Sequence, residues 1–239
     1  LLQIPSVFFC LEMRAWDAEK GSIWDSALAG SSSLRAAVLR ALKVENGCAR
    51  GDWVGHLLWG MKKFYDSVRL RTLAVELIKR DYPLELMVLG FLVHAGPRVL
   101  KVGKCFGPIV HRCRSSILAG DQQSGSWTRG LLAELLEKIS KVDPEFPCWS
   151  HVDDLSHVLV GETGGELNAK LLQAGRIVGS EVKRLHLTLS DKSTLLPQND
   201  ITRAVAAKLT SEGIPLKTGT TCDDVGVQMS GSRIRKAKS

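Results

Sequence analysis

The sequence predicts an α+β fold in which an antiparallel sheet packs on helices. Strand-like and helix-like segments do not alternate strictly along the 239 residues, which argues against a regular parallel sheet. Two β-rich runs flank Asp153 and Asp154, and this arrangement indicates a tight hairpin of antiparallel strands. Apolar residues at helical spacing between Leu70 and Ile78 indicate a helix with one buried face.

Helices are predicted from apolar periodicity together with caps and breakers. The serines at 31–33 can cap the first helix, and Asn46-Gly47 is expected to end it. Pro83 ends the second helix, and the third is expected to be more buried because it is very apolar. Asp200 can cap the last helix, with Gly213 just past its end. The predicted helices cover residues 34–45, 70–78, 84–94, 128–141, 166–185 and 200–211.

Strands are predicted from short runs of β-forming residues. The apolar run 54–58 is short enough for a buried strand. Gly103-Lys104 joins two strands in a hairpin, and the acidic pair lies at the tip of another. Trp16 and Trp24 are expected to be packing residues in a first segment of mixed character. The predicted strands cover residues 54–58, 98–102, 105–110, two runs within 148–160, 187–189, 194–196 and 225–229.

Composition restricts the class of protein. The net charge of +7 and the pI of about 9.2 suit a polyanionic partner. The six cysteines show no C-x-x-C spacing, which favours reduced thiols in an intracellular protein, nuclear or cytoplasmic. The apolar start lacks a basic region and a cleavage site, so secretion is not expected. The longest apolar run contains Glu85 and is too short for a bilayer, and oligomeric state is not predicted.

Asp153 and Asp154 are candidate metal ligands. Adjacent carboxylates at a hairpin tip offer hard oxygen ligands for a divalent cation. A pair of such cations can clamp the attacking and leaving oxygens of phosphoryl transfer. The alternative is a solvated turn, because Asp is common in turns and Asp223-Asp224 forms a second pair with no evident chemistry.

Four segments in this order accompany the acidic pair: WGMKKFYDSV at 59–68, GDQQS at 120–124, HVDD at 151–154 and LTLSDKST at 187–194. Together they resemble the palm of reverse transcriptases, specifically those of retroelements and their non-LTR relatives. The resemblance implies a right-hand polymerase palm over residues 54–229. Residues 1–53 would form a partial fingers or N-terminal region, and 230–239 a basic, disordered tail. It also implies an RNA-directed DNA polymerase with an RNA template, a DNA primer, dNTP and two Mg²⁺ ions.

The resemblance assigns roles residue by residue. Asp153 looks like the hairpin carboxylate that ligates both metals, and Asp154 looks like its more peripheral partner. Tyr65 matches the aromatic residue that packs under the incoming sugar and excludes a 2′-hydroxyl. Gln123 matches the glutamine that steadies nucleotide and template. Lys192 matches the lysine near the triphosphate, which is a candidate general acid for the pyrophosphate leaving group.

Simpler interpretations stay open for three of these residues. Tyr65 could be a core aromatic that follows a strand. Gln123 could belong to a polar loop that caps the next helix, and Gln122 is the alternative in register. Lys192 could be a solvated lysine in a turn.

The sequence departs from the family at Gly60, where the first palm strand should end in an aspartate five residues before Tyr65. Neither Asp52, at the other end of the strand, nor Asp66, expected to cap the following helix, is a convincing replacement. Losing a metal-bridging acid is expected to weaken Mg²⁺ binding and slow catalysis. Each ~1.4 kcal/mol added to the activation free energy lowers the rate tenfold. The prediction is therefore reverse-transcriptase-like DNA synthesis by two-metal nucleotidyl transfer, impaired at Gly60. The alternatives are a non-catalytic nucleic-acid-binding remnant and a structural or interaction domain.

Overall fold

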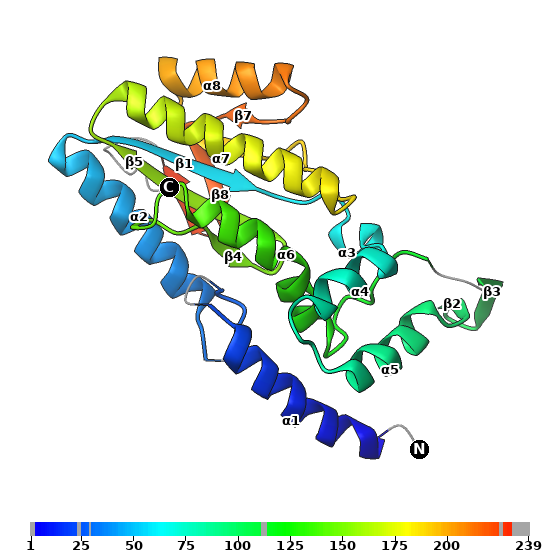
Figure 1. The fold of residues 1–239 in the computed structure, drawn as a ribbon. Coiled ribbons are helices and arrows are strands. Elements are labelled where there is room, and N and C mark those ends of the chain that lie inside the picture. Colours follow the sequence, from blue (N-terminus) through cyan, green and yellow to red (C-terminus); the bar gives the residue numbers. More distant parts are fainter. Residues whose placement is uncertain (1–2, 23–24, 29, 111–113, 225–226, 231–239) are drawn as a thin grey trace. The chain divides into compact units, whose positions relative to one another are not determined.

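The computed structural model describes residues 3–22, 25–28, 30–110, 114–224 and 227–230 (Figure 1). The chain forms two compact units, and each unit combines two separate stretches of sequence. The first unit contains described residues up to 21 together with 63–132. The second contains the described residues of 22–62 together with those after 132. The fingers and palm boundaries stay a prediction, and the predicted tail lies outside the described residues apart from Ser230.

Helices and strands are mixed along the described residues, which confirms a mixed α and β composition. The helices are α1 Gln3–Lys20, α2 Ser33–Arg50, α3 Phe64–Ser67, α4 Leu70–Ile78, α5 Leu84–Ala95, α6 Ser124–Ser140, α7 Gly164–Arg184 and α8 Asp200–Ser211. The strands are β1 Trp53–Trp59, β2 Arg98–Val102, β3 Cys105–Val110, β4 Trp149–His151, β5 Asp154–Gly161, β6 Thr194–Leu196, β7 Lys217–Thr218, β8 Thr221–Asp224 and β9 Val227–Ser230.

The second unit is built on a five-stranded sheet in the order β4-β5-β1-β6-β7. Strand β1 pairs antiparallel with β5, from Trp53 opposite Gly161 to Trp59 opposite Leu155, and antiparallel with β6 on its other side. The predicted antiparallel sheet is wrong at its edge, because β6 and β7 are parallel. Helix α8 lies between these two strands in the sequence, and a parallel pair requires such a crossover connection.

Helices cover both faces of β1. Successive side chains of a strand point to opposite faces. A Cβ at Gly55 would lie 3.0 Å from Leu171 Cδ2 of α7, so α7 packs closely on that face. The neighbouring Val54 points to the other face, where its Cγ2 would lie 2.7 Å from a Cβ at Gly47 of α2. The central strand is therefore buried between two helices, and it holds a fixed position at the centre of the unit.

The end of α2 differs from the prediction. Asn46-Gly47 was expected to stop this helix, yet the helix continues to Arg50. Gly47 serves close packing instead, because any side chain there would overlap Val54. The helix ends at Gly51, whose φ of +84° is the left-handed conformation that glycine adopts at helix C-termini.

The first unit begins with α1, a helix that the sequence analysis did not predict. Trp16 of this helix is buried, as expected, and its Nε1 donates a hydrogen bond to the Arg80 carbonyl at 3.0 Å. Its ring also contacts Tyr82 edge-on, with ring centroids 5.0 Å apart. Asp17 accepts hydrogen bonds from Arg129 and from the Ser126 hydroxyl of α6. Trp24, the other expected packing residue, lies outside the described residues.

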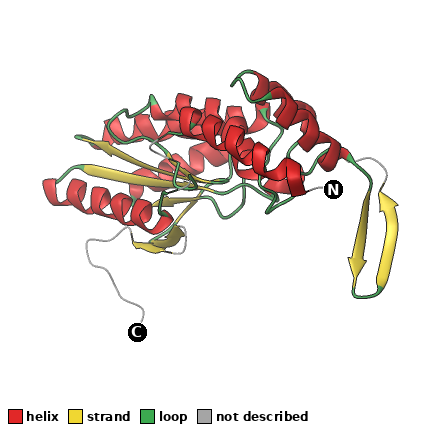
Figure 2. Ribbon diagram, turned by 90° about the horizontal axis from the view of Figure 1, so that it is seen from below, coloured by secondary structure: helices red, strands yellow, loops and turns green. Residues whose placement is uncertain are grey.

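Helix α5 and the β2–β3 hairpin have the predicted positions, but α5 is less buried than expected. One side of α5 packs inward through Leu86, Met87, Gly90 and His94. The opposite side exposes Leu84, Val88, Leu89, Leu92 and Val93. Beyond α5, the β2–β3 hairpin stands apart from the helices of its unit (Figure 2). No helix within the described part of the chain is both long and apolar enough to cross a membrane.

Candidate functional site

The predicted acidic hairpin is present in the second unit. His151 at the end of β4 pairs with Asp154 at the start of β5, so Val152 and Asp153 form a two-residue turn. Val152 has a φ of +57°, as the first central residue of a type II′ turn does. Glycine is preferred at that position, and a non-glycine residue there costs about 1–3 kcal/mol. The turn that presents the carboxylates is therefore strained.

The hairpin is anchored by residues that the sequence analysis missed. The Ser26 hydroxyl donates a hydrogen bond to the Ser150 carbonyl at 2.9 Å and lies 3.2 Å from His151 Nδ1. From α2, the buried Arg40 guanidinium lies 5.8 Å from the centre of the Trp149 ring. No local sequence pattern connects these residues, because they are distant in the chain and meet only when β4 joins the sheet.

The two carboxylates differ in exposure. Asp154 is exposed, whereas Asp153 is half-buried. Burial raises the pKa of Asp153 above its ordinary value, and the neighbouring charge of Asp154 raises it further. A divalent cation at the hairpin tip would relieve this repulsion, which gives the pair a physical basis for metal affinity.

Gly60 follows the last residue of β1 and lies beside the acidic pair. A Cβ at this position would be 3.6 Å from Asp154 Oδ1 and 3.5 Å from Ser190 Cβ, both ordinary contact distances. The position is therefore next to the hairpin acids and has room for a side chain. Asp52 does not supply a carboxylate beside the hairpin acids, since it lies at the opposite end of β1 and pairs with Arg50.

The donor set for a pair of magnesium ions is incomplete. Among the described residues, no group of three or more acidic, histidine or cysteine side chains is positioned to hold a metal. The hairpin supplies two adjacent carboxylates, and Gly60 supplies none. The residues present therefore do not fit the two-ion site that the resemblance implied.

The segment that leads to Lys192 is bound directly to the chain around Gly60. Ser190 N donates to the Gly60 carbonyl at 2.8 Å, and Lys62 N donates to the Thr188 carbonyl at 2.8 Å. The strand predicted at 187–189 is reduced to one bridge, since only Leu189 pairs with β-geometry here. Lys192 itself is exposed in the turn that follows, and its N–H donates to Ser190 Oγ at 3.2 Å.

The remaining candidates, Tyr65 and Gln123, belong to the first unit. Tyr65 is half-buried in α3, with its ring edge-on to Phe64 at 5.5 Å between centroids. Its carbonyl accepts a hydrogen bond from Ile117 N at 2.9 Å. This bond ties the short helix to the loop that leads toward Gln123.

Gln123 is held by its own unit. Its side-chain oxygen accepts a hydrogen bond from the Tyr82 hydroxyl at 3.2 Å, and its N–H donates to Asp121 Oδ1 at 2.9 Å. His94, buried beneath this loop, lowers the pKa of the Asp121 carboxyl. Gln122, the alternative in register, is exposed, and the role of either glutamine stays a prediction.

Comparison with known proteins identifies the fold. No protein-family model and no curated protein matches the chain. Among solved structures, an apo telomerase from Candida tropicalis truncated from its C-terminal domain matches 98% of this chain, with a TM-score of 0.59 and 10% identity. A telomerase from the same organism, in complex with the TWJ fragment of telomeric RNA, matches 80% of the chain, with a TM-score of 0.53 and 11% identity.

The chain has a reverse-transcriptase-like fold. Telomerase is a polymerase related to reverse transcriptases, and identities of 10% and 11% extend the likeness to the fold alone. The chain spans 44% and 33% of the two telomerase chains, less than half of each. Within the reverse-transcriptase-like fold, the second unit brings Gly60 and Asp154 together, and the segment before Lys192 lies alongside them.

Proposed function

We propose that this chain is a nucleic-acid-binding polymerase palm of retroelement origin, in which template-directed DNA synthesis is impaired. The observation that carries the proposal is the position of Gly60, where a side chain would contact Asp154 at 3.6 Å. The reverse-transcriptase-like fold and the net charge of +7 support RNA template, DNA primer and dNTP as partners. The matched telomerase in complex with telomeric RNA supports the same class of partner.

The proposed impairment follows from the chemistry of nucleotidyl transfer. Positioned metal ions and electrostatic stabilisation provide most of the catalysis in phosphoryl transfer. We propose that Asp153 and Asp154 bind Mg²⁺ weakly, because Gly60 contributes no third carboxylate. Lys192 would protonate the leaving pyrophosphate, while Tyr65 and Gln123 would contact the incoming nucleotide. The chain would then bind its substrates and extend primers slowly.

Primer extension on an RNA template tests the catalytic part. The unmodified chain is compared with Gly60→Asp, which supplies the missing carboxylate, and with Gly60→Asn, which has nearly the same shape without the charge. We expect little extension by the unmodified chain and by Gly60→Asn, and at least tenfold more by Gly60→Asp. The proposal is wrong if the unmodified chain extends primers as fast as Gly60→Asp.

Binding to an RNA–DNA duplex tests the other part. Contacts to phosphates release counterions, so affinity should fall steeply as salt rises from about 50 to 200 mM. Affinity that does not change with salt would contradict nucleic-acid binding through backbone phosphates.

The alternative of a structural or interaction domain makes a separate prediction about the hairpin. If the acidic pair is only a turn, Asp153→Asn should leave the response of the protein to Mg²⁺ unchanged. If the pair is a residual metal site, Asp153→Asn should remove that response. Thermal melting with and without Mg²⁺ distinguishes the two without requiring activity.

A further inference from the structure

The positive charge of this chain is concentrated in two segments. Residues 86–120 contain five basic residues and no acidic one, and residues 225–239 contain four basic residues and no acidic one. Because the whole chain carries +7, the other residues together carry −2. The basic residues of the first segment are Arg98, Lys101, Lys104, Arg112 and Arg114. This segment contains the β2–β3 hairpin, which we call the basic ribbon (Arg98–Val110).

Lys101, Phe106 and Lys104 are exposed on the basic ribbon. In the described part of the chain, β2 and β3 pair with each other and with no other strand. Lys101 lies opposite Phe106 across the ribbon, with Nζ 5.5 Å from the centre of the ring. Phe106 is nevertheless 69% exposed, and Lys104 is exposed in the turn. An aromatic ring this exposed beside a cation is characteristic of a surface that contacts a ligand.

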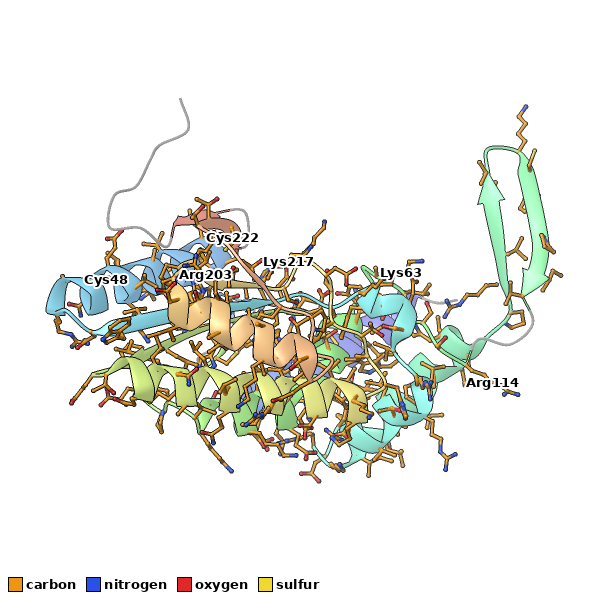
Figure 3. The ribbon with its side chains drawn as sticks, turned by 90° about the horizontal axis from the view of Figure 1, so that it is seen from above. Cys48, Lys63, Arg114, Arg203, Lys217 and Cys222 are labelled. Carbon is orange, nitrogen blue, oxygen red and sulfur yellow. The ribbon has the colours of Figure 1, made fainter. Side chains whose placement is uncertain are left out.

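The ribbon is firmly attached at its base. The Arg98 guanidinium donates hydrogen bonds to the His94 carbonyl of α5 and, at 3.2 Å, to the Ser116 hydroxyl. Arg98 is therefore a structural residue, and the charges available to a ligand are those toward the turn. Figure 3 shows the ribbon standing away from the helices of its unit, and the labelled Arg114, which is exposed, lies nearer its base. The ribbon thus presents its charges from a fixed base.

We propose that the basic ribbon binds a nucleic-acid strand with unpaired bases. Lys101 and Lys104 would contact backbone phosphates, and the exposed ring of Phe106 would stack on a base. Phosphate contacts supply most of the affinity of such binding, and stacking on an aromatic residue adds to it for unpaired bases. This inference rests on the proposed function, because it locates part of the nucleic-acid surface of the polymerase palm.

The experiment measures binding of the full chain to a fluorescently labelled single-stranded RNA at several salt concentrations. The ribbon variant is Lys101→Ala/Lys104→Ala. The control is Lys183→Ala/Lys208→Ala, which removes the same charge from exposed positions on α7 and α8. A third variant, Phe106→Leu, removes the ring and keeps an apolar side chain. Because all three ribbon positions are exposed, the variants should melt at the temperature of the unmodified chain.

We expect the ribbon variant to bind the RNA less tightly than the control variant does. The slope of log affinity against log salt concentration should be reduced by about 1.4, because each of the two lost phosphate contacts on a single strand contributes about 0.7. Phe106→Leu should weaken RNA binding by roughly 5-fold or more, which is the lower range for loss of one stacked base. Binding to polyglutamate, which has charge without bases, should not change in Phe106→Leu.

Equal affinities and salt slopes for the ribbon variant and the control would overturn the inference. A Phe106→Leu variant that binds RNA as tightly as the unmodified chain would also overturn it. These outcomes differ from failure of the proposed function, in which the unmodified chain itself would show no salt-dependent binding to RNA.

Discussion

Placing a carboxylate at Gly60 should make the stability of the protein depend on magnesium. A Cβ at this position lies 3.6 Å from Asp154 Oδ1, so the carboxylates of Gly60→Asp and Asp154 would be on the order of 5 Å apart. At that distance two negative charges repel by about 1 kcal/mol in water and by about 3 kcal/mol near a protein surface. In a chain of this size, each kcal/mol shifts Tm by roughly 2–4 °C.

Without divalent metal, Gly60→Asp should therefore melt about 2–12 °C below Gly60→Asn, which has nearly the same shape and no charge. With Mg²⁺ at about 1,000-fold above Kd the order should reverse, because a stabilisation of about 4.1 kcal/mol exceeds the repulsion of about 1–3 kcal/mol. A cation held by three carboxylates stabilises the folded state, by about 2.7 kcal/mol when its concentration is 100-fold above Kd. The assay is thermal melting of both variants in EDTA and in increasing concentrations of Mg²⁺.

The comparison of aspartate with asparagine isolates the charge, because both substitutions change the flexibility of the unfolded chain alike. Adding Asp154→Asn to Gly60→Asp should remove most of the repulsion and most of the magnesium effect. If Gly60→Asp and Gly60→Asn melt together in EDTA and respond equally to Mg²⁺, then Gly60 does not lie beside a metal-binding pair, and the reasoning fails.

Three further predictions concern the turn, a buried histidine and a packing contact. Val152→Gly should raise Tm by roughly 2–4 °C, because it relieves about 1 kcal/mol of strain at the positive φ, and a lower Tm would contradict that strain. Burial lowers the pKa of His157 from 6.5 to about 3, so the unfolded chain binds a proton that the folded chain excludes. The free energy of unfolding should therefore fall as pH decreases from about 6.5 toward 3. In denaturant titrations, His157→Gln should reduce the dependence of this free energy on pH by up to about 1.4 kcal/mol per pH unit. Gly90→Ala would place a Cβ 2.5 Å from the Trp127 ring and should lower the free energy of unfolding by about 1–3 kcal/mol. Gly125→Ala adds a Cβ in open space and should stabilise α6 by about 0.5–1 kcal/mol. Equal Tm values for the two variants would contradict the packing argument.

Local patterns in the sequence predicted most elements of the fold. The two hairpins and the helices α4, α5, α7 and α8 lie within a few residues of their predicted positions, because apolar spacing and turn residues are local signals. The errors occurred where tertiary contacts decide. The pair Asn46-Gly47 is typical of a helix end, but Gly47 packs against Val54 and lies inside α2. Strand β7 has two residues and depends on β6 for its pairing.

The candidate site was predictable in part for the same reason. The hairpin with Asp153 and Asp154 is a local motif, and the resemblance leads to Gly60 by counting back five residues from Tyr65, an assignment that stays a prediction. The proximity of Gly60 to Asp154 follows from the pairing register of β1 and β5, which local sequence patterns do not determine. Arg40 also gave no signal, because a buried arginine beside an indole is recognisable only after α2 and β4 are placed.

Glycine at position 60 is compatible with a well-formed fold, because the fold does not require an acid there. The stability of the sheet unit comes from apolar contacts, such as those that bury β1 between α2 and α7. Burial raises the pKa of Asp153, and the neighbouring charge of Asp154 raises it further, so a third carboxylate beside this pair would add repulsion to the folded state. Replacing one acid of such a cluster with glycine removes repulsion from the folded state while it removes a metal ligand. The stability of the folded state therefore does not favour an acid over glycine at this position in the absence of metal.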